Sequence, residues 1–176
     1  MRTFVYVGTS LDGFIAEKDG DIDWLGEFEG EEVRRAYRGF ISKIDAVVIG
    51  RGTFEKVLTY RTWPYDKMVF VLSSSVTQIP GNLKGKVRIL SLKPGEILAF
   101  LAKGGFSSIS VDGGKVIQAF LREDCIDELV ITRVPLLLGS GIPLFGDLDK
   151  DLKFDHIQTE VFSNGLVKSH YRRVRT

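Results

Sequence analysis

Histidine and cysteine are scarce in this sequence. The chain has one cysteine, Cys125, and two histidines, His156 and His170, among its 176 residues. A single cysteine cannot form an intramolecular disulfide, which favours a reducing, cytoplasmic setting. Neither histidine has a partner at the spacing of a metal site or a catalytic triad. These shortages argue against metal hydrolases and serine hydrolases, and we expect no metal ion.

An excess of charge and a long apolar run are also lacking. The formal net charge is +1, and the most basic stretch is the terminal YRRVRT. We interpret this stretch as a solvated terminus and not as a binding arm, so we expect no nucleic-acid partner. No apolar run approaches the roughly 18 residues of a membrane span. The first residues lack the apolar core of a signal peptide, and we expect no membrane partner.

Strand-like and helix-like patterns alternate along the chain. An alternating order of this kind predicts an α/β fold with a mostly parallel sheet. Asn164-Gly165 lies between two alternating runs and predicts an antiparallel C-terminal hairpin over 158–174. No linker or repeat interrupts the pattern, so residues 1–176 are expected to form a single domain. Strands are expected at 2–8, 45–50, 67–73, 86–92, 107–113 and 127–138, helices at 31–44, 52–58, 94–104 and 115–123, and a long loop at 20–30.

Three strand ends carry residues suited to an anionic ligand. The carboxyl ends of parallel strands meet at one edge of a sheet, where α/β proteins bind ligands. A guanidinium, hydroxyl groups and the free amides of a helix N-terminus all suit a phosphate. Each segment alone is more often a plain turn, and their joint occurrence favours a phosphate site. The residues are Gly50, Arg51 and Thr53 in VVIGRGTFE, Ser73 and Ser74 in VFVLSSS, and Gly113 and Gly114 in VDGGKVI.

The order of these motifs resembles the dihydrofolate reductase superfamily. SLDGFIA, VVIGRGTFE, VFVLSSS, VDGGKVIQAFL and DELVITRVPLLLGSGIPLF follow one another as in that superfamily. The first and last of them are most similar to the branch that includes the reductase domain of the riboflavin-biosynthesis deaminase–reductase. The resemblance implies a dihydrofolate reductase-like three-layer fold for the whole chain.

The resemblance also implies NADPH as the cofactor. Arg51 and Thr53 are then expected to contact its phosphates, and Ser73 and Ser74 to lie near the adenosine 2′-phosphate. An arginine and hydroxyl groups at that position favour NADPH over NADH. The remaining cofactor-binding residues that the resemblance implies are Gly50, Asp112, Gly113, Gly114, Lys115 and Val116.

Fewer residues match the family's substrate-binding site than match its cofactor site. Asp12 matches a position near the nicotinamide, and Thr132 matches a threonine that holds the substrate ring. Trp24 is similar to the tryptophan of a mobile loop that covers the active site. It can stack on a planar heterocycle together with other aromatic residues, but core packing or a dimer contact explains these aromatic residues equally well.

The catalytic carboxylate and the substrate-phosphate site depart from the family pattern. Counting five residues from Trp24 gives Glu29 as the carboxylate, with Glu31 and Glu32 as alternatives. Acidic residues in the first turn of a helix also stabilise its dipole, which is the simpler interpretation of these glutamates. The acidic-proline pair of the riboflavin reductase is missing, and Arg61 is the one arginine in the corresponding segment and the candidate to hold the substrate phosphate.

We therefore expect an NADPH-dependent reductase that transfers a hydride to a small pterin- or pyrimidine-like substrate. A riboflavin-pathway reduction of 5-amino-6-(5-phosphoribosylamino)uracil is favoured over dihydrofolate reduction. A non-catalytic NADPH-binding protein is the alternative, because no proton donor is assured. The apolar stretch VPLLLGSGIPLF exceeds what one loop needs and predicts a homodimer.

Overall fold

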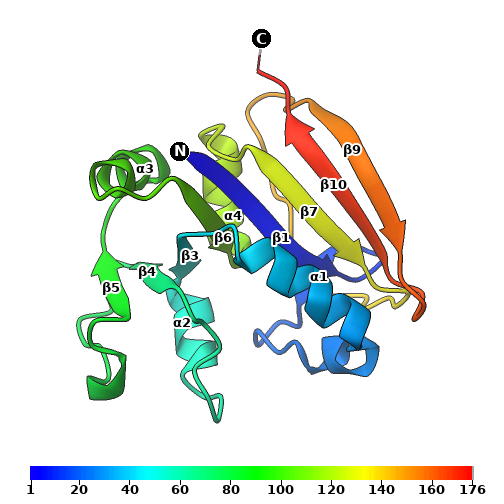
Figure 1. Ribbon diagram of the computed structural model, residues 1–176, viewed down its shortest axis with the longest axis horizontal. Coiled ribbons are helices and arrows are strands. Elements are labelled where there is room, and N and C mark those ends of the chain that lie inside the picture. Colours follow the sequence, from blue (N-terminus) through cyan, green and yellow to red (C-terminus); the bar gives the residue numbers. More distant parts are fainter. Residues whose placement is uncertain (176) are drawn as a thin grey trace.

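The computed structural model describes residues 1–175 and contains one large sheet with helices on both faces (Figure 1). The strands of this sheet are β1 (Arg2–Thr9), β3 (Ala46–Gly50), β4 (Met68–Leu72), β5 (Val87–Leu90), β6 (Ser108–Asp112), β7 (Glu128–Arg133), β9 (Phe154–Val161) and β10 (Val167–Arg173). A separate short ribbon consists of β2 (Phe14–Ala16) and β8 (Ile142–Pro143). The α-helices are α1 (Glu31–Ile41), α2 (Arg51–Val57), α3 (Pro94–Lys103) and α4 (Gly114–Arg122), and the 3₁₀ helices are η1 (Asp23–Phe28) and η2 (Gly81–Leu83).

The strand order confirms the predicted α/β architecture. The eight strands are arranged β5-β4-β3-β6-β1-β7-β10-β9. From β5 to β7 all neighbours are parallel. The predicted C-terminal hairpin forms β9 and β10, which join antiparallel to each other and to β7. All the parallel strands therefore end at the same edge of the twisted sheet.

Buried apolar residues alternate between the two faces of the sheet. In β3, Val48 packs with α3 and α4, whereas Val47 and Ile49 pack with Phe54 of α2. Strands that are covered on both faces have to be apolar throughout, as the run AVVIG shows. On the face of α2, the ring of Tyr6 on β1 stacks on Phe40 of α1 at 4.5 Å. The sheet thus forms the middle of three layers.

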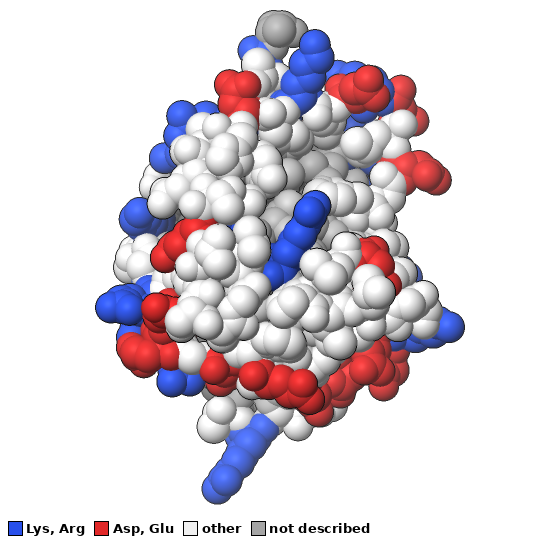
Figure 2. Space-filling view, turned by 90° about the vertical axis from the view of Figure 1, so that its right-hand side faces the viewer, with Lys and Arg blue, Asp and Glu red and all other residues white. Residues whose placement is uncertain are grey.

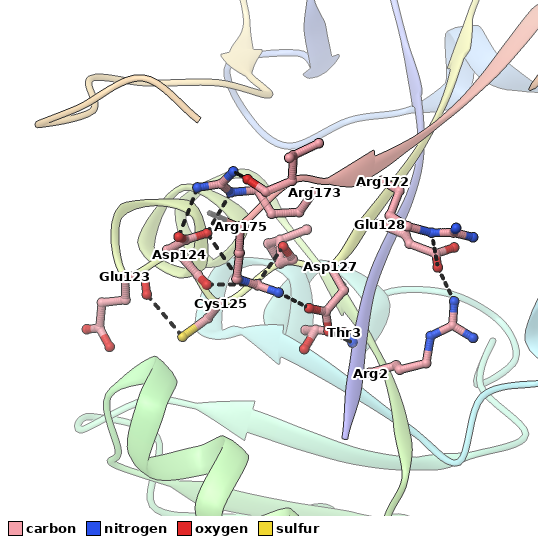
Figure 3. A network of polar contacts seen from close by, with 12 residues as sticks. Arg2, Thr3, Glu123, Asp124, Cys125, Asp127, Glu128, Arg172, Arg173 and Arg175 are labelled. Atoms are coloured by element: carbon pink, nitrogen blue, oxygen red, sulfur yellow. Dashed lines mark hydrogen bonds and ion pairs between the residues drawn. The ribbon is translucent and has the colours of Figure 1, made fainter. Parts of the chain in front are cut away.

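The basic C-terminal tail is part of the folded structure, which corrects the expectation of a solvated terminus (Figure 3). Arg173 binds both carboxylate oxygens of Asp124, at 2.8 and 3.0 Å. Arg175 contacts Asp127 and the backbone oxygens of Asp124 and Ile126. The tail therefore holds the turn between α4 and β7 in place, and its arginines Arg173 and Arg175 bind carboxylates and backbone oxygens of the same chain.

Several local details differ from the sequence-based expectations. The 20–30 loop contains η1, and the strand expected over 127–138 ends at Arg133, just before Pro135. Proline has no N–H for a ladder hydrogen bond, which explains that early end. The β2–β8 ribbon had no clear sequence signal because its strands are only three and two residues long. Within residues 1–175, no helix has the length and apolar character to cross a membrane.

Candidate active site

Three sequence segments meet where β3, β4 and β6 end. We call Gly50–Thr53, Ser73–Ser75 and Asp112–Lys115 the strand-end cluster. A Cβ atom on Gly113 would lie 2.4 Å from Oγ1 of Thr53, and one on Gly50 would lie 2.8 Å from Cγ2 of Val116. These approaches leave no room for a side chain, so the glycines allow close packing between the strand ends and the helices that follow. The structure thus brings together the three segments that the sequence suggested.

Two backbone amides of α4 are available for an anion. The amide of Gly113 donates to the carboxylate of Asp112 at 2.7 Å, and that of Val116 donates to the carbonyl of Gly113 at 3.0 Å. Within residues 1–175, the amides of Gly114 and Lys115 make no hydrogen bond to protein atoms. Free amides and the helix dipole both favour a phosphate at such a helix start. Gly114 and Lys115 are therefore the donors, whereas Gly113 shapes the turn with its φ of +91°.

Arg51 reaches across the cluster to the serines that follow β4. Its Nη1 donates to Oγ of Ser75 at 3.3 Å, and its Nε lies 3.8 Å from Glu55 on the same helix. The hydroxyl of Ser73 accepts the amides of Ser75 and Val76 at 3.1 and 3.0 Å, so it stabilises the turn. Ser75 was absent from the sequence-predicted site, although it belongs to the same SSS run. The basic and hydroxyl groups at this point are thus Arg51, Ser74 and Ser75.

A carboxylic acid and a phenol form a pair beside the cluster. The phenol of Tyr65 and the carboxyl group of Asp112 are close enough for each to shift the pKa of the other. Burial raises the pKa of Asp112 above its ordinary value, against the smaller lowering effects of its bonds to Gly113 and Tyr65. Burial also raises the pKa of Tyr65, and the nearby negative charge of Asp112 raises it further. Asp112 forms no ion pair among the described residues, so it holds a proton more readily than an exposed aspartate does.

Aromatic packing fixes the position of Tyr65. Its ring meets that of Trp63 edge to face at 5.3 Å, and Trp63 meets the buried Phe54 at 6.3 Å. Tyr65 and Tyr37 of α1 line a small cavity of about 30 Å³. Tyr65 was considered only as aromatic surface in the sequence, because its contact with Asp112 depends on the path of the loop after α2.

Two sequence-predicted substrate residues lie farther along the same edge. Thr132 is buried on β7 and paired with Gly8 of β1. Asp12 accepts the hydroxyl of Ser10 at 2.6 Å and the amide of Gly139 at 2.7 Å. The Ser10 bond and then the backbone bonds hold the pKa of Asp12 below its ordinary value. Asp12 is therefore ionised and braces the loop around Gly139, and its role beside a nicotinamide stays a prediction.

The structure gives other sequence-predicted residues different surroundings. Trp24 is 9% exposed and packs with Val134 and Phe162 in a cluster of its own, which accounts for its burial, and its substrate-binding role stays a prediction. Glu29 is exposed and lies 3.6 Å from Arg34, and Arg61 is exposed in the loop after α2. Catalytic and substrate roles for Glu29 and Arg61 stay predictions.

The alternative glutamates also have partners. Glu32 accepts the amide and hydroxyl of Ser163 at 3.0 and 2.7 Å, and Glu31 pairs with Arg38. These bonds hold the pKa of each glutamate below its ordinary value. Neither glutamate is therefore set up to hold a proton. Among the described residues, no three His, Cys, Asp or Glu side chains converge in the way that a metal ion requires.

Comparison with solved structures shows the fold family. A protein of Shewanella sp. PV-4, provisionally named as a riboflavin biosynthesis protein, is 43% identical with a TM-score of 0.93, over 99% of this chain and 100% of that one. The deaminase/5-amino-6-(5-phosphoribosylamino)uracil reductase of Thermotoga maritima is 20% identical with a TM-score of 0.73, over 98% of this chain and 56% of its own. The dihydrofolate reductase of Enterococcus faecalis, solved with NADP(H), has 20% identity and a TM-score of 0.66, over 98% and 96% of the two chains.

These similarities confirm the dihydrofolate reductase-like fold that the motif order predicts. The family described as the RibD C-terminal domain matches residues 3–168, which is nearly the whole chain. The protein belongs to the RibD C-terminal domain family.

Proposed function

We propose that this protein is an NADPH-dependent reductase of a small pyrimidine-like substrate, of the riboflavin-pathway type. The observation that carries the proposal is the strand-end cluster, where free amides, an arginine and hydroxyl groups meet at one sheet edge. The adjoining Tyr65–Asp112 pair adds a group that can hold a proton. Family membership supports a reductase, since a relative of this fold carries 5-amino-6-(5-phosphoribosylamino)uracil reductase in its name.

The strand-end cluster fits the cofactor that the fold family implies. The amides of Gly114 and Lys115 would receive the pyrophosphate, and Gly113 forms the turn that leaves these amides free. Arg51, with Ser74 and Ser75, would receive the adenosine 2′-phosphate. Bound NADPH supplies the hydride for the reduction.

Asp112 and Tyr65 are the best candidates for proton delivery. A carboxyl group whose pKa is raised by burial keeps its proton closer to neutral pH. Asp112, or Tyr65 beside it, would supply the proton that the substrate takes up along with the hydride. Asp12, Glu31 and Glu32 are less suited, because hydrogen bonds to their ionised forms lower their pKa values.

Enzyme turnover tests the proposal against its alternatives. Purified protein is mixed with NADPH and either 5-amino-6-(5-phosphoribosylamino)uracil or dihydrofolate, and the loss of NADPH absorbance is followed. We expect turnover of the pyrimidine compound and a loss of about 10²–10⁴-fold in Asp112→Asn. Asp66→Asn, a change of an exposed aspartate near Tyr65, is the matched control and should retain activity.

The other outcomes favour the other functions. Turnover of dihydrofolate alone would favour a dihydrofolate reductase. Tight NADPH binding without turnover of either compound would favour a non-catalytic binding protein.

We also propose that the protein is a cytoplasmic homodimer. The view onto the β9 side of the molecule shows wide uncharged areas, with a basic side chain near the centre and acidic side chains mainly along the lower part (Figure 2). Val161 on the edge strand β9 is 69% exposed, and Leu137 and Phe145 of the predicted apolar stretch are 67% and 50% exposed. Exposed apolar side chains on an edge strand and in a loop are candidates for contact with a second copy about a twofold axis.

A further inference from the structure

A small cavity lies between α1 and the loop that leads into β4. Its volume is about 30 Å³, which gives room for about two water molecules. Its walls include Ile41, the last residue of α1, and Val47, the second residue of β3. The cavity therefore lies towards the amino end of β3, whereas the strand-end cluster lies at the carboxyl end of that strand.

Polar side chains make up much of the cavity wall. Tyr37 of α1 lines one side, and Tyr65, Asp66 and Lys67 of the loop line the other. Asp66 is exposed, so the cavity reaches the surface at this residue. Within residues 1–175, the hydroxyl of Tyr37 makes no hydrogen bond to another protein group. A cavity with this many polar partners is suited to hold ordered water.

Asp112 lies a short distance along β6 from the cavity wall. Val47 of the wall pairs with Ser110, and Asp112 is two residues farther along the same strand. Two residues of a strand span about 7 Å, and their side chains point to the same face of the sheet. Burial and then the charge of Asp112 raise the pKa of both Tyr37 and Tyr65. The two phenols thus lie between the cavity and Asp112.

Aromatic contacts hold the ring of Tyr37 in place. It meets the ring of Tyr6 on β1 edge to face at 5.7 Å and lies 6.5 Å from the ring of Phe40 on the same helix. These contacts involve the ring and not the hydroxyl. Tyr37→Phe therefore keeps the packing and removes only the group that can bind water.

We propose that Tyr37 is a positioning residue that orders water in this cavity, through which Asp112 regains a proton from solvent after each reduction. The proposal rests on the proposed function, in which Asp112 or Tyr65 gives a proton to the substrate. Substrate and NADPH would lie on the strand-end side of Asp112, so the cavity is the side that stays open to water.

The protons balance over one cycle. Asp112 loses one proton to the substrate and takes one from a water molecule of the cavity. The hydroxide left behind takes a proton from solvent at the mouth beside Asp66 and Lys67, which returns the site to its first state. Tyr37 itself neither gains nor loses a proton in the net reaction.

The pH dependence of kcat tests this role, with NADPH and 5-amino-6-(5-phosphoribosylamino)uracil as substrates. Proton return is slowest where protons are scarce, so Tyr37→Phe should lower kcat about three- to tenfold at about pH 8.5 and leave it unchanged at about pH 6. Ammonium chloride supplies a small acid and should restore kcat at the higher pH, whereas potassium chloride should not. Tyr60→Phe is the matched control, because Tyr60 is similarly exposed, at 36% against 40%, and does not line the cavity.

Crystal structures of wild type and Tyr37→Phe examine the water directly. We expect an ordered water molecule within hydrogen-bonding distance of the hydroxyls of Tyr37 and Tyr65 in wild type. In Tyr37→Phe this water should be displaced or lost, while the aromatic rings keep their places.

A dry cavity in wild type would overturn the proposal. An equal loss of kcat in Tyr37→Phe at both pH values, or no loss at about pH 8.5, would also overturn it, since neither result fits a role in proton return. In these cases the wild-type protein still turns over the substrate, so the proposed function stands. Failure of wild type to turn over either test compound would instead refute the proposed function, and this proposal with it.

Discussion

At the scale of single residues, the glycines of the strand-end cluster combine packing with ligand access. Gly113 has a φ of +91° and no space for a Cβ, whereas Gly20 has a φ of +85° with open space around it. Gly113→Ala should lower the free energy of unfolding by at least about 2 kcal/mol, and Gly20→Ala by about 1 kcal/mol. Urea denaturation measures both. Equal losses would mean that the contact with Thr53 has no energetic effect.

Gly114 is a poor position for a binding test. A Cβ there would lie 2.8 Å from Cγ2 of Ile142 and 3.1 Å from the carbonyl of Pro143. An aspartate at this position would disturb the β2–β8 ribbon along with any phosphate. Arg51 is the better probe, because its side chain is exposed and its removal leaves the core intact.

Arg51→Ala should weaken NADPH binding about 10- to 100-fold, since a hydrogen bond to a charged group contributes about 1.5–3 kcal/mol. The affinity for NADH, which lacks the 2′-phosphate, should change little. Isothermal titration with each nucleotide measures the two affinities, and Arg88→Ala at an exposed position on β5 is the matched control. Equal losses for NADPH and NADH would show that Arg51 does not recognise the 2′-phosphate.

At the scale of elements, the junction between α1 and β3 is stabilised by an ionised aspartate. Asp45 accepts the hydroxyl and amide of Ser107 and the amide of Ser108, which lowers its pKa from 3.8 to about 2. A lowered pKa stabilises the fold fully above the unfolded value of 3.8, and this contribution disappears as the pH falls towards 2.

At pH 7 the wild-type protein should therefore have a higher melting temperature than the Asp45→Asn variant. The difference between the two melting temperatures should shrink below about pH 4. Thermal melts across this pH range measure the difference. A difference that stays constant down to pH 2 would contradict the assigned cause.

The C-terminal tail provides a second test at this scale. Arg173 is 8% exposed and holds Asp124 through two bonds, whereas Arg175 is 45% exposed. Arg173→Ala should cost about 2–3 kcal/mol of unfolding free energy because it removes both hydrogen bonds to a largely buried carboxylate, which keeps only the longer contact with Arg175. Arg175→Ala should cost about 0.5–1 kcal/mol. Similar losses in urea denaturation would mean that burial does not matter here.

The sequence allowed the regular elements to be predicted better than the contacts between them. The run AVVIG and the turn at Asn164-Gly165 carry local signals, and β3 and the β9–β10 hairpin form where those signals lie. The proximity of Tyr65 to Asp112 and the ion pair between Lys56 and Asp21 depend on how long loops fold, which no local pattern encodes. Trp24 shows the same limit, because its burial follows from the hairpin packing against η1.

At the scale of the whole molecule, the uncharged β9 side predicts association. Val161→Glu should shift the protein from dimer to monomer in sedimentation velocity, because a charge on a buried contact surface has no partner. Glu55→Lys on the exposed face of α2 is a charge-changing control and should leave the dimer intact. Wild type that sediments as a monomer at micromolar concentration would contradict the proposed homodimer.

The central claim is that the strand-end cluster binds NADPH, and thermal unfolding with added nucleotide tests it most directly. NADPH at about 100 times its dissociation constant should stabilise wild type by roughly 2.7 kcal/mol. Arg51→Ala should lose about half or more of this stabilisation at the same NADPH concentration, and NADH should stabilise both proteins only weakly. A melting temperature that neither nucleotide changes would contradict the account.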